Sequence, residues 1–394
     1  MLSTLRYTGQ SGVTTLLARP FRPLFACASI FAVLVMGGWL AIFHGILPAP
    51  RGFAPGVWHA HEMVFGYAVA VIAGFLLTAV ENWTGRETAR GKMLAVLVGL
   101  WLTARITPFV PVPDWLGRSS DLAFLIVVAL IVGKCVYAAG QRRNLVMVVI
   151  LALLAVTHGF FYAGLGRGAD PGMEWVNLAL RLIVVLIALI AGRVVPSFTG
   201  NAIAGHQPAA QRKLETASIV LLGVWLVAES IPGTAGWLRL VAGIGIAVVL
   251  GLRCRGWFAP GVVKNPMLWV LYAGFIWVVT GFGLTALAAV YVLPGSAATH
   301  AFTVGGIGVM TAGMMARVTM GHTGRPIRAS RTLVVCFGLL NAAALVRVAV
   351  PIFAPHWFVV AVSVSSWGWM LGFALLAWNL LPMVVAPRVD GKNG

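Results

Sequence analysis

The chain has 394 residues, of which 60% are hydrophobic and 10% charged, and its formal net charge is +18. This composition excludes a soluble globular protein and predicts an all-α polytopic membrane protein in contact with the lipid bilayer. The positive charge would suggest nucleic-acid binding in a soluble chain. Here the basic residues gather in alternate loops, so we expect no nucleic-acid partner.

Apolar stretches long enough to cross a bilayer follow one another along residues 1–394, which we treat as a single membrane domain. The twelve predicted spans are 24–47, 57–80, 92–110, 119–138, 145–165, 175–195, 214–231, 236–253, 266–292, 297–320, 332–353 and 357–382. The first run follows Arg19 and Arg22, but it is too long for the apolar part of a signal peptide and is interpreted as a retained helix.

The loops on one side of the predicted bundle carry most of the arginines and lysines. Examples are Arg86 and Arg90, Arg142 and Arg143, Arg212 and Lys213, and Arg325 and Arg328. The positive-inside rule therefore predicts that both termini lie in the cytoplasm. All four cysteines fall near predicted cytoplasmic helix ends and are expected to be reduced thiols.

Three landmarks recur in the same order and indicate three tandem four-helix units, at about 20–140, 141–262 and 263–385. A basic residue followed by Pro or Asn opens predicted helices 1, 5 and 9, at intervals of 121 residues. Helices 2, 6 and 10 end in the Thr-Gly turns "NWTGR", "SFTGN" and "GHTGR". A charged residue lies three or four residues before a proline in helices 3, 7 and 11. We expect a pseudo-threefold axis along the membrane normal.

Histidines gather at one predicted depth, near the outer ends of the helices. His61 and His300 each stand 23 residues before the threonine of a Thr-Gly turn, so they occupy the same repeat position. The candidate metal ligands at this depth are His44, His59, His61, His158, His300 and His356. His44 and His356 have a simpler alternative role as interfacial residues.

The spacing within one helix limits how the histidines can share a metal. Residues two apart on a helix point about 200° from one another, so His59 and His61 serve two centres unless His59 precedes the helix. His322 is about 33 Å from His300 along one helix and cannot share its metal. His206 is interpreted as a solvated loop residue.

Three arginines, Arg105, Arg181 and Arg347, are predicted at the same depth as the histidines. An unpaired guanidinium within a span costs about 2.5–3.5 kcal/mol on insertion scales. The acidic residues considered as partners are Glu62, Glu81 and Glu229, which would leave positive charge unpaired in this layer. Haem would satisfy both groups, since histidines ligate its iron and arginines pair with its propionates. The alternative is a salt bridge from Glu229 to Arg105 or Arg347.

Three stretches carry a specific resemblance: "WHAHEMVFGYAVAVIAGFLLTAVENWTGR", "AGRVVPSFTGNA" and "HAFTVGGIGVMTAGMMARVTMGHTGRP". Together they resemble the NnrS family of bacterial inner-membrane proteins, over essentially the whole chain. The resemblance implies a haem- and copper-containing protein linked to nitric oxide metabolism, denitrification and nitrosative stress. If copper binds, His44, His59 or His356, with Met63, are plausible ligands.

The predicted architecture is also similar to the catalytic subunit (subunit I) of haem-copper oxidases and nitric oxide reductases. Those proteins take metal ligands from helices 6 and 7 as well, and predicted helices 6 and 7 contain no histidine here. A copied binuclear centre is therefore not expected, and the likeness of fold is weak support for function.

The leading hypothesis is a membrane haem protein that binds or turns over nitric oxide; in the second case it would be an oxidoreductase with an electron donor that the sequence does not identify. His61 and His300 are expected as axial ligands of one or two b-type haems, which are non-covalent because the chain has no CxxCH motif. His59 would ligate a second centre, and Arg105, Arg181 and Arg347 would pair with anionic groups. Glu62 is a candidate proton donor, with a role as a favourable first-turn acid as its alternative.

Two other functions stay open. One is a haem-based sensor or scavenger of nitric oxide without turnover. The other is a transporter whose anion cavity is lined by the same arginines.

Overall fold

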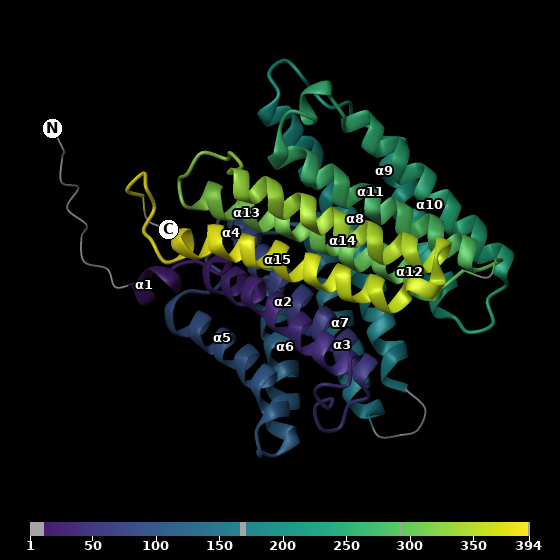
Figure 1. The fold of residues 1–394 in the computed structure, drawn as a ribbon. Coiled ribbons are helices and arrows are strands. Elements are labelled where there is room, and N and C mark those ends of the chain that lie inside the picture. The colour runs from purple at the N-terminus through teal and green to yellow at the C-terminus, as the bar shows by residue number, and fades with distance from the viewer. Residues whose placement is uncertain (1–11, 166–170, 292, 393–394) are drawn as a thin grey trace.

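The computed structural model describes residues 12–165, 171–291 and 293–392 (Figure 1). These residues form helices joined by short loops and contain no β-strand. The predicted all-α class is confirmed.

Long helices account for most of the chain. In the first half they are α2 (Phe21–Phe43), α4 (Val69–Thr84), α5 (Gly91–Ile106), α6 (Asp114–Ala138), α7 (Leu145–Gly164) and α8 (Pro171–Ala202). In the second half they are α9 (Arg212–Ser230), α10 (Gly236–Trp257), α11 (Pro266–Ala288), α13 (Met310–His322), α14 (Arg331–Phe353) and α15 (Phe358–Val384). The short helices are α1 (Gly12–Leu16), α3 (Pro55–His61) and α12 (Gly295–His300). Short 3₁₀ turns are η2 (Thr107–Phe109), η3 (Arg142–Asn144), η4 (Pro260–Val262) and η6 (Pro355–Trp357), and two π-helical segments are η1 (Glu62–Ala68) and η5 (Ala301–Val309).

Eleven helices within the described residues are long and apolar enough to cross a membrane, so the chain is a multi-pass membrane protein. Each of the twelve predicted spans coincides with a helix, but α9 is not one of the eleven. The reason lies in its ends, where Arg212, Lys213, Glu215 and Glu229 bring charge into a helix of only 19 residues.

Helices that follow one another in sequence mostly pack side by side, and α15 closes the bundle against α2 (Figure 1). Three transmembrane helices lie inside this ring. They are the continuous helix α3–η1–α4, the helix α8, and the continuous helix α12–η5–α13, and each contacts the other two. A hydrogen bond of 2.6 Å between the hydroxyls of Tyr67 and Thr311 joins two of them at their buried faces. These inner helices correspond to predicted spans 2, 6 and 10.

The two inner helices that carry the histidine motifs are the most buried of the candidate spans. In Pro55–Thr84, 78% of the most apolar 18-residue stretch is buried, and in Gly295–His322 the share is 83%, against 28–50% for the others. Each of these helices contains a π-helical segment that begins directly after His61 or His300. A π-helical turn holds an extra residue and is often found at functional sites. The two histidines therefore share a backbone position, as the sequence predicted.

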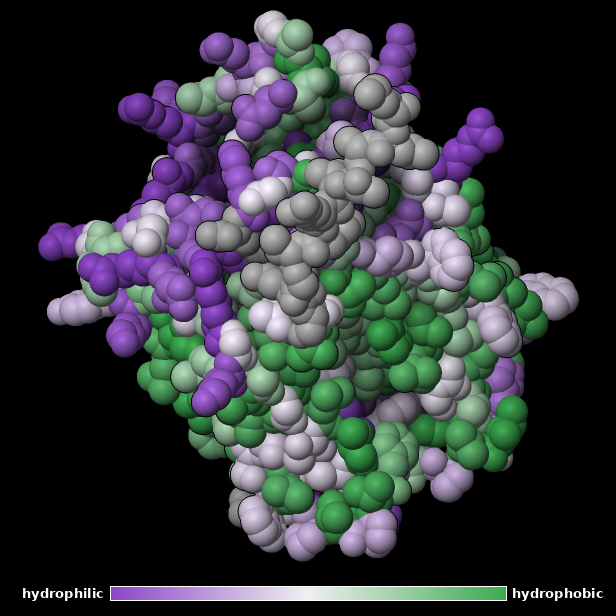
Figure 2. Space-filling model, turned by 90° about the vertical axis from the view of Figure 1, so that its left-hand side faces the viewer, coloured by the Kyte–Doolittle hydropathy of each residue, from purple (hydrophilic) through white to green (hydrophobic). Residues whose placement is uncertain are grey.

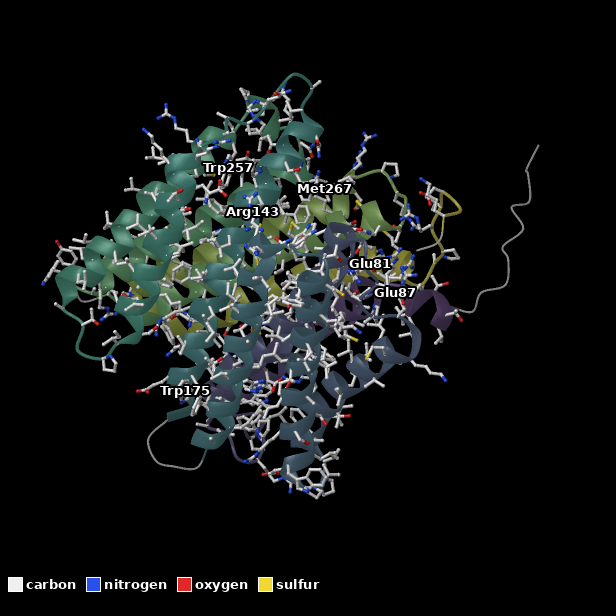
Figure 3. All side chains as sticks on the ribbon, turned by 180° about the vertical axis from the view of Figure 1, so that it is seen from behind. Glu81, Glu87, Arg143, Trp175, Trp257 and Met267 are labelled. Carbon is white, nitrogen blue, oxygen red and sulfur yellow. The ribbon has the colours of Figure 1, made fainter. Side chains whose placement is uncertain are left out.

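Polar residues gather at the end of the bundle that holds α1 and the C-terminal residues. Figure 2 looks onto this end, and hydrophilic side chains cover its upper and left parts while hydrophobic side chains cover much of the rest. Glu81 lies here and accepts hydrogen bonds from both Arg19 and Arg90. In Figure 3, Glu81 and Glu87 lie toward the N-terminal end of the chain, and Trp175 lies far from them at the other end of the bundle. We call this end of the bundle the basic face, because its loops carry arginines such as Arg19, Arg86 and Arg90.

Candidate metal and cofactor sites

The two histidines of "WHAHEM" face different parts of the protein. Both belong to the regular helix α3, which ends at His61, so their side chains point in different directions. His61 is 1% exposed and faces α6 and α7. His59 instead lines a cavity together with residues of α2, α8, α12 and α14. The structure thus has two candidate sites at this depth.

The first site is a buried group of ionisable side chains that we call the enclosed cluster. Its members are His61, Glu62, Arg105, Asp121, His158 and Tyr162. The Nε2 atoms of His61 and His158 are 3.1 Å apart. Oδ2 of Asp121 is 3.6 Å from Nε2 of His61 and 3.4 Å from Nε2 of His158.

Hydrogen bonds fix the carboxylates of the enclosed cluster. Arg105 donates to Oε2 of Glu62 at 2.6 Å and also to Oδ2 of Asp121. The Tyr162 hydroxyl donates to the same Asp121 oxygen at 2.8 Å, and Nδ1 of His61 lies 3.0 Å from Oε1 of Glu62. One guanidinium therefore bridges two carboxylates from different helices.

Local sequence explains how four transmembrane helices meet at the enclosed cluster. Arg105 stands in the last turn of α5, and His158 and Tyr162 are four residues apart on α7, so they share a face. Gly66 in η1 leaves room for the ion pair, because a Cβ at this position would lie 2.7 Å from Nη1 of Arg105. Its carbonyl accepts a hydrogen bond of 2.9 Å from the Trp101 indole, which ties η1 to α5.

The enclosed cluster corrects two expectations. Arg105 was expected to leave unpaired positive charge, but it is paired with Glu62 and Asp121. The partners expected for the arginines are Glu62, Glu81 and Glu229, but Arg105 also pairs with Asp121, which stands in the predicted span 119–138. An aspartate inside an apolar span, at the depth predicted for Arg105, is the signal that would have identified it. Asp121, His61 and His158 together could hold a metal ion.

The second site is a cavity of about 330 Å³ that we call the His59–His300 cavity. Its wall combines many apolar side chains with a few polar ones, as is usual for cofactor sites. The polar or ligating groups in the wall include His59, Met63, Asn177, Ser296, Thr299, His300, Thr303 and Arg347. His61 is absent from this wall and lines a separate small pocket of about 30 Å³ with Glu62 and Tyr162.

Several polar atoms of the His59–His300 cavity are free to contact a ligand. Nδ1 of His300 lies 2.6 Å from the Ser296 carbonyl oxygen, which assigns the proton to Nδ1 and leaves Nε2 as the ligating nitrogen. Nδ1 of His59 and Nη1 of Arg347 are buried and have no hydrogen-bond partner among the described residues. The His59 ring stacks on Trp39 with centroids 4.3 Å apart, which fixes its orientation.

The remaining predicted residues lie outside both sites. Arg181 lines a third cavity, of about 350 Å³, with Glu229 and Arg239. Glu229 forms its ion pair with Arg239 at 2.7 Å, so the alternative of a bridge to Arg105 or Arg347 is wrong. The arginines of the transporter hypothesis therefore do not line one shared cavity.

Three other histidines are also accounted for. His44 is exposed, and its Nε2 lies 2.9 Å from the Ser363 hydroxyl. His356 is exposed in the turn η6. His322 lines a cavity of about 590 Å³ with Arg143 and Arg193, away from the other histidines. Glu62 belongs to the enclosed cluster and does not line the His59–His300 cavity, and its role as a proton donor stays a prediction.

Comparison with known proteins gives one family. A sequence profile of the NnrS family, described as NnrS protein, matches residues 15–388, nearly the whole chain. No curated protein matches the chain.

Proposed function

The chain belongs to the NnrS family, and on this basis we propose that it is a haem-containing membrane protein of the nitric oxide response, with haem held in the His59–His300 cavity. The observation that carries the proposal is that one cavity holds both the His300 imidazole, with its Nε2 free, and the Arg347 guanidinium, which lies over the Phe358 ring and has a buried Nη1 without a hydrogen-bond partner among the described residues.

The side chains that line the cavity are of the chemical types that hold haem in proteins. Imidazoles are common ligands of haem iron, cationic donors pair with its propionates, and apolar walls pack against its ring. His300 and His59 would supply the imidazoles and Arg347 would pair with a propionate. The volume of about 330 Å³ falls within the usual range for cofactor and small-molecule sites. His61 was the other expected axial ligand, but it faces the enclosed cluster, so His59 takes its place in this proposal.

Bound haem would supply an iron that binds nitric oxide and exchanges electrons with it. The chain's own residues would orient the cofactor and exclude water. Trp39 holds the His59 ring by stacking, and the Ser296 carbonyl holds the His300 ring by hydrogen bonding. Met63 lines the same cavity; if copper binds there as a second metal, His59 would ligate it with Met63, and His300 alone would ligate the haem iron.

The proposed architecture is three tandem units, at about 20–140, 141–262 and 263–385, arranged like subunit I of haem-copper oxidases. Two observations support it. The second helix of each unit belongs to the inner trio, and His61 and His300 precede π-helical segments at the same position of units one and three.

We further propose that the protein lies in the bacterial inner membrane with the basic face in the cytoplasm. The arginines and lysines of the alternate loops support this orientation. Single cysteines introduced at exposed Arg86 and Asp114 would test it, because only the second should react with an impermeant thiol reagent in intact cells.

The test of the haem proposal is the haem content and the oxidised and reduced optical spectra of the purified protein. A Soret band is expected in the wild type and in His44→Ala, whose histidine is exposed and lies outside the cavity. His300→Ala should lose or shift the band. A folded, colourless wild type after expression with ample haem would overturn the proposal.

The same preparation separates the candidate functions. Consumption of nitric oxide that depends on an electron donor would indicate a reductase. A coloured protein that binds nitric oxide without consuming it would indicate a sensor or scavenger.

A further inference from the structure

We propose that the enclosed cluster is a metal site, in which His61, His158 and Asp121 bind one ferrous ion separately from the haem cavity. This inference rests on the geometry of the enclosed cluster and does not require haem to bind. The three residues come from three transmembrane helices, which are α3, α7 and α6. All three side chains are buried, at 1–2% exposure.

The spacing of the three ligand atoms fits a single metal ion. Ligand bonds of about 2.1 Å place neighbouring ligand atoms about 3.0 Å apart at right angles and about 3.4 Å apart in a tetrahedron. The observed separations are 3.1, 3.4 and 3.6 Å. They match this range to within a few tenths of an ångström, so an ion could bind with little movement of the side chains.

The surrounding residues orient His61 in the way that metal sites require, whereas Nδ1 of His158 has no hydrogen-bond partner among the described residues. A ligating histidine usually donates its other ring N–H to a carboxylate or a carbonyl, which leaves the second nitrogen free for the metal. Nδ1 of His61 is 3.0 Å from the Glu62 carboxylate, so its Nε2 points to the other two ligands. The rings are also held by stacking: Phe65 lies against His158 at 3.9 Å and Phe161 against His61 at 4.5 Å.

The charges of the enclosed cluster call for a cation. Asp121 and Glu62 contribute two negative charges, and Arg105 is the only arginine or lysine that pairs with them among the described residues. With both carboxylates ionised and both imidazoles neutral, one negative charge is left over in a buried part of a membrane protein, where uncompensated charge is costly. A bound metal cation between the imidazoles and Asp121 would neutralise it.

The donor set identifies the class of metal. Two histidines and one carboxylate on one face of an ion, with other positions open, are typical of non-haem iron(II). Thiolate ligands that would favour copper(I) are absent from the enclosed cluster, since none of its six members is a cysteine. The small pocket of about 30 Å³ beside His61, Glu62 and Tyr162 reaches the exposed Arg51 and Asp114 and offers an access route for an ion or a small ligand.

The test is the metal content and metal affinity of the full-length protein, purified without metal and then titrated anaerobically with iron(II). The wild type should bind about one iron per chain, and so should His300→Ala, which changes only the haem cavity. His158→Ala should lose this iron. Glu62→Gln keeps all three ligands but weakens the support of His61, and it should lower iron affinity about 10- to 100-fold.

Each outcome decides the proposal. The proposal stands if iron is lost in His158→Ala while thermal unfolding shows that the variant is folded, and if nitric oxide added to wild-type iron(II) protein gives a high-spin iron EPR signal. If His158→Ala does not fold, Glu62→Gln serves as the deciding variant. Equal iron binding by wild type and the folded variants would overturn the site. Binding of zinc or copper with no binding of iron(II) would overturn the choice of metal.

Failure of the haem proposal can be distinguished from failure of the iron site. In that case the protein would lack a Soret band but would still bind iron through His61, His158 and Asp121.

Discussion

Replacing Arg105 with methionine should strongly destabilise the protein. Arg105 is 6% exposed and is the common partner of Glu62, at 2.6 Å, and Asp121. Methionine keeps much of the volume but leaves two buried carboxylates without their cation. Removing one partner of a buried ion pair typically costs about 3–5 kcal/mol, and two carboxylates share this partner, so we expect a loss in the free energy of unfolding at the upper end of that range.

A matched control is available on the neighbouring helix. Arg118 pairs with Asp114 at 3.1 Å, but the two side chains are 39% and 65% exposed. Arg118→Met should therefore cost no more than about 1 kcal/mol. Both variants can be compared by thermal or denaturant unfolding in one detergent. Equal losses for the two substitutions would refute the role assigned to Arg105.

Three further substitutions test other parts of the fold. Gly66→Ala should destabilise the protein by about 1–3 kcal/mol, because the added Cβ would lie 2.7 Å from Nη1 of Arg105. A variant as stable as the wild type in unfolding experiments would contradict the close packing of η1. Arg22→Met removes hydrogen bonds of 2.7 and 2.8 Å to carbonyls at the end of α15, so limited proteolysis should cleave the C-terminal residues faster than in the wild type. Glu229→Gln should cost less stability than Arg105→Met, because Arg239 is 36% exposed and can be hydrated; an equal or larger loss in unfolding experiments would be inconsistent with this.

Much of the fold could be predicted from the sequence because each span carries its own signal. Length and apolarity identify a transmembrane helix without reference to its neighbours, so all twelve predicted spans coincide with helices. The repeat of the Thr-Gly turns placed His61 and His300 at one position, and the π-helical segments after both residues agree with this. These features depend on local sequence.

The pairing of side chains across helices could not be predicted in the same way. Depth along a helix follows from the 1.5 Å rise per residue, but the direction in which a side chain points depends on how each helix is rotated in the bundle. His61 and His158 were placed in one layer by depth, and they do meet. His44 and His356 were placed in the same layer, but they are exposed.

The arginines illustrate the same limit. Arg105, Arg181 and Arg347 were expected to act together because they share a depth. In the structure Arg105 belongs to the enclosed cluster, Arg347 lines the His59–His300 cavity, and Arg181 lines a third cavity. Because Arg105 pairs with Asp121 as well as Glu62, it needs no further anionic partner. A single anionic ligand for all three arginines is therefore unnecessary.

The most direct test of the central claim is the optical spectrum of the reduced, haem-loaded protein before and after nitric oxide is added. Nitric oxide should shift the Soret band of the wild type and of His158→Ala, whose histidine belongs to the enclosed cluster. His300→Ala should lack that band or its response. An unchanged response in folded His300→Ala, or no response in the wild type, would contradict nitric oxide binding in the His59–His300 cavity.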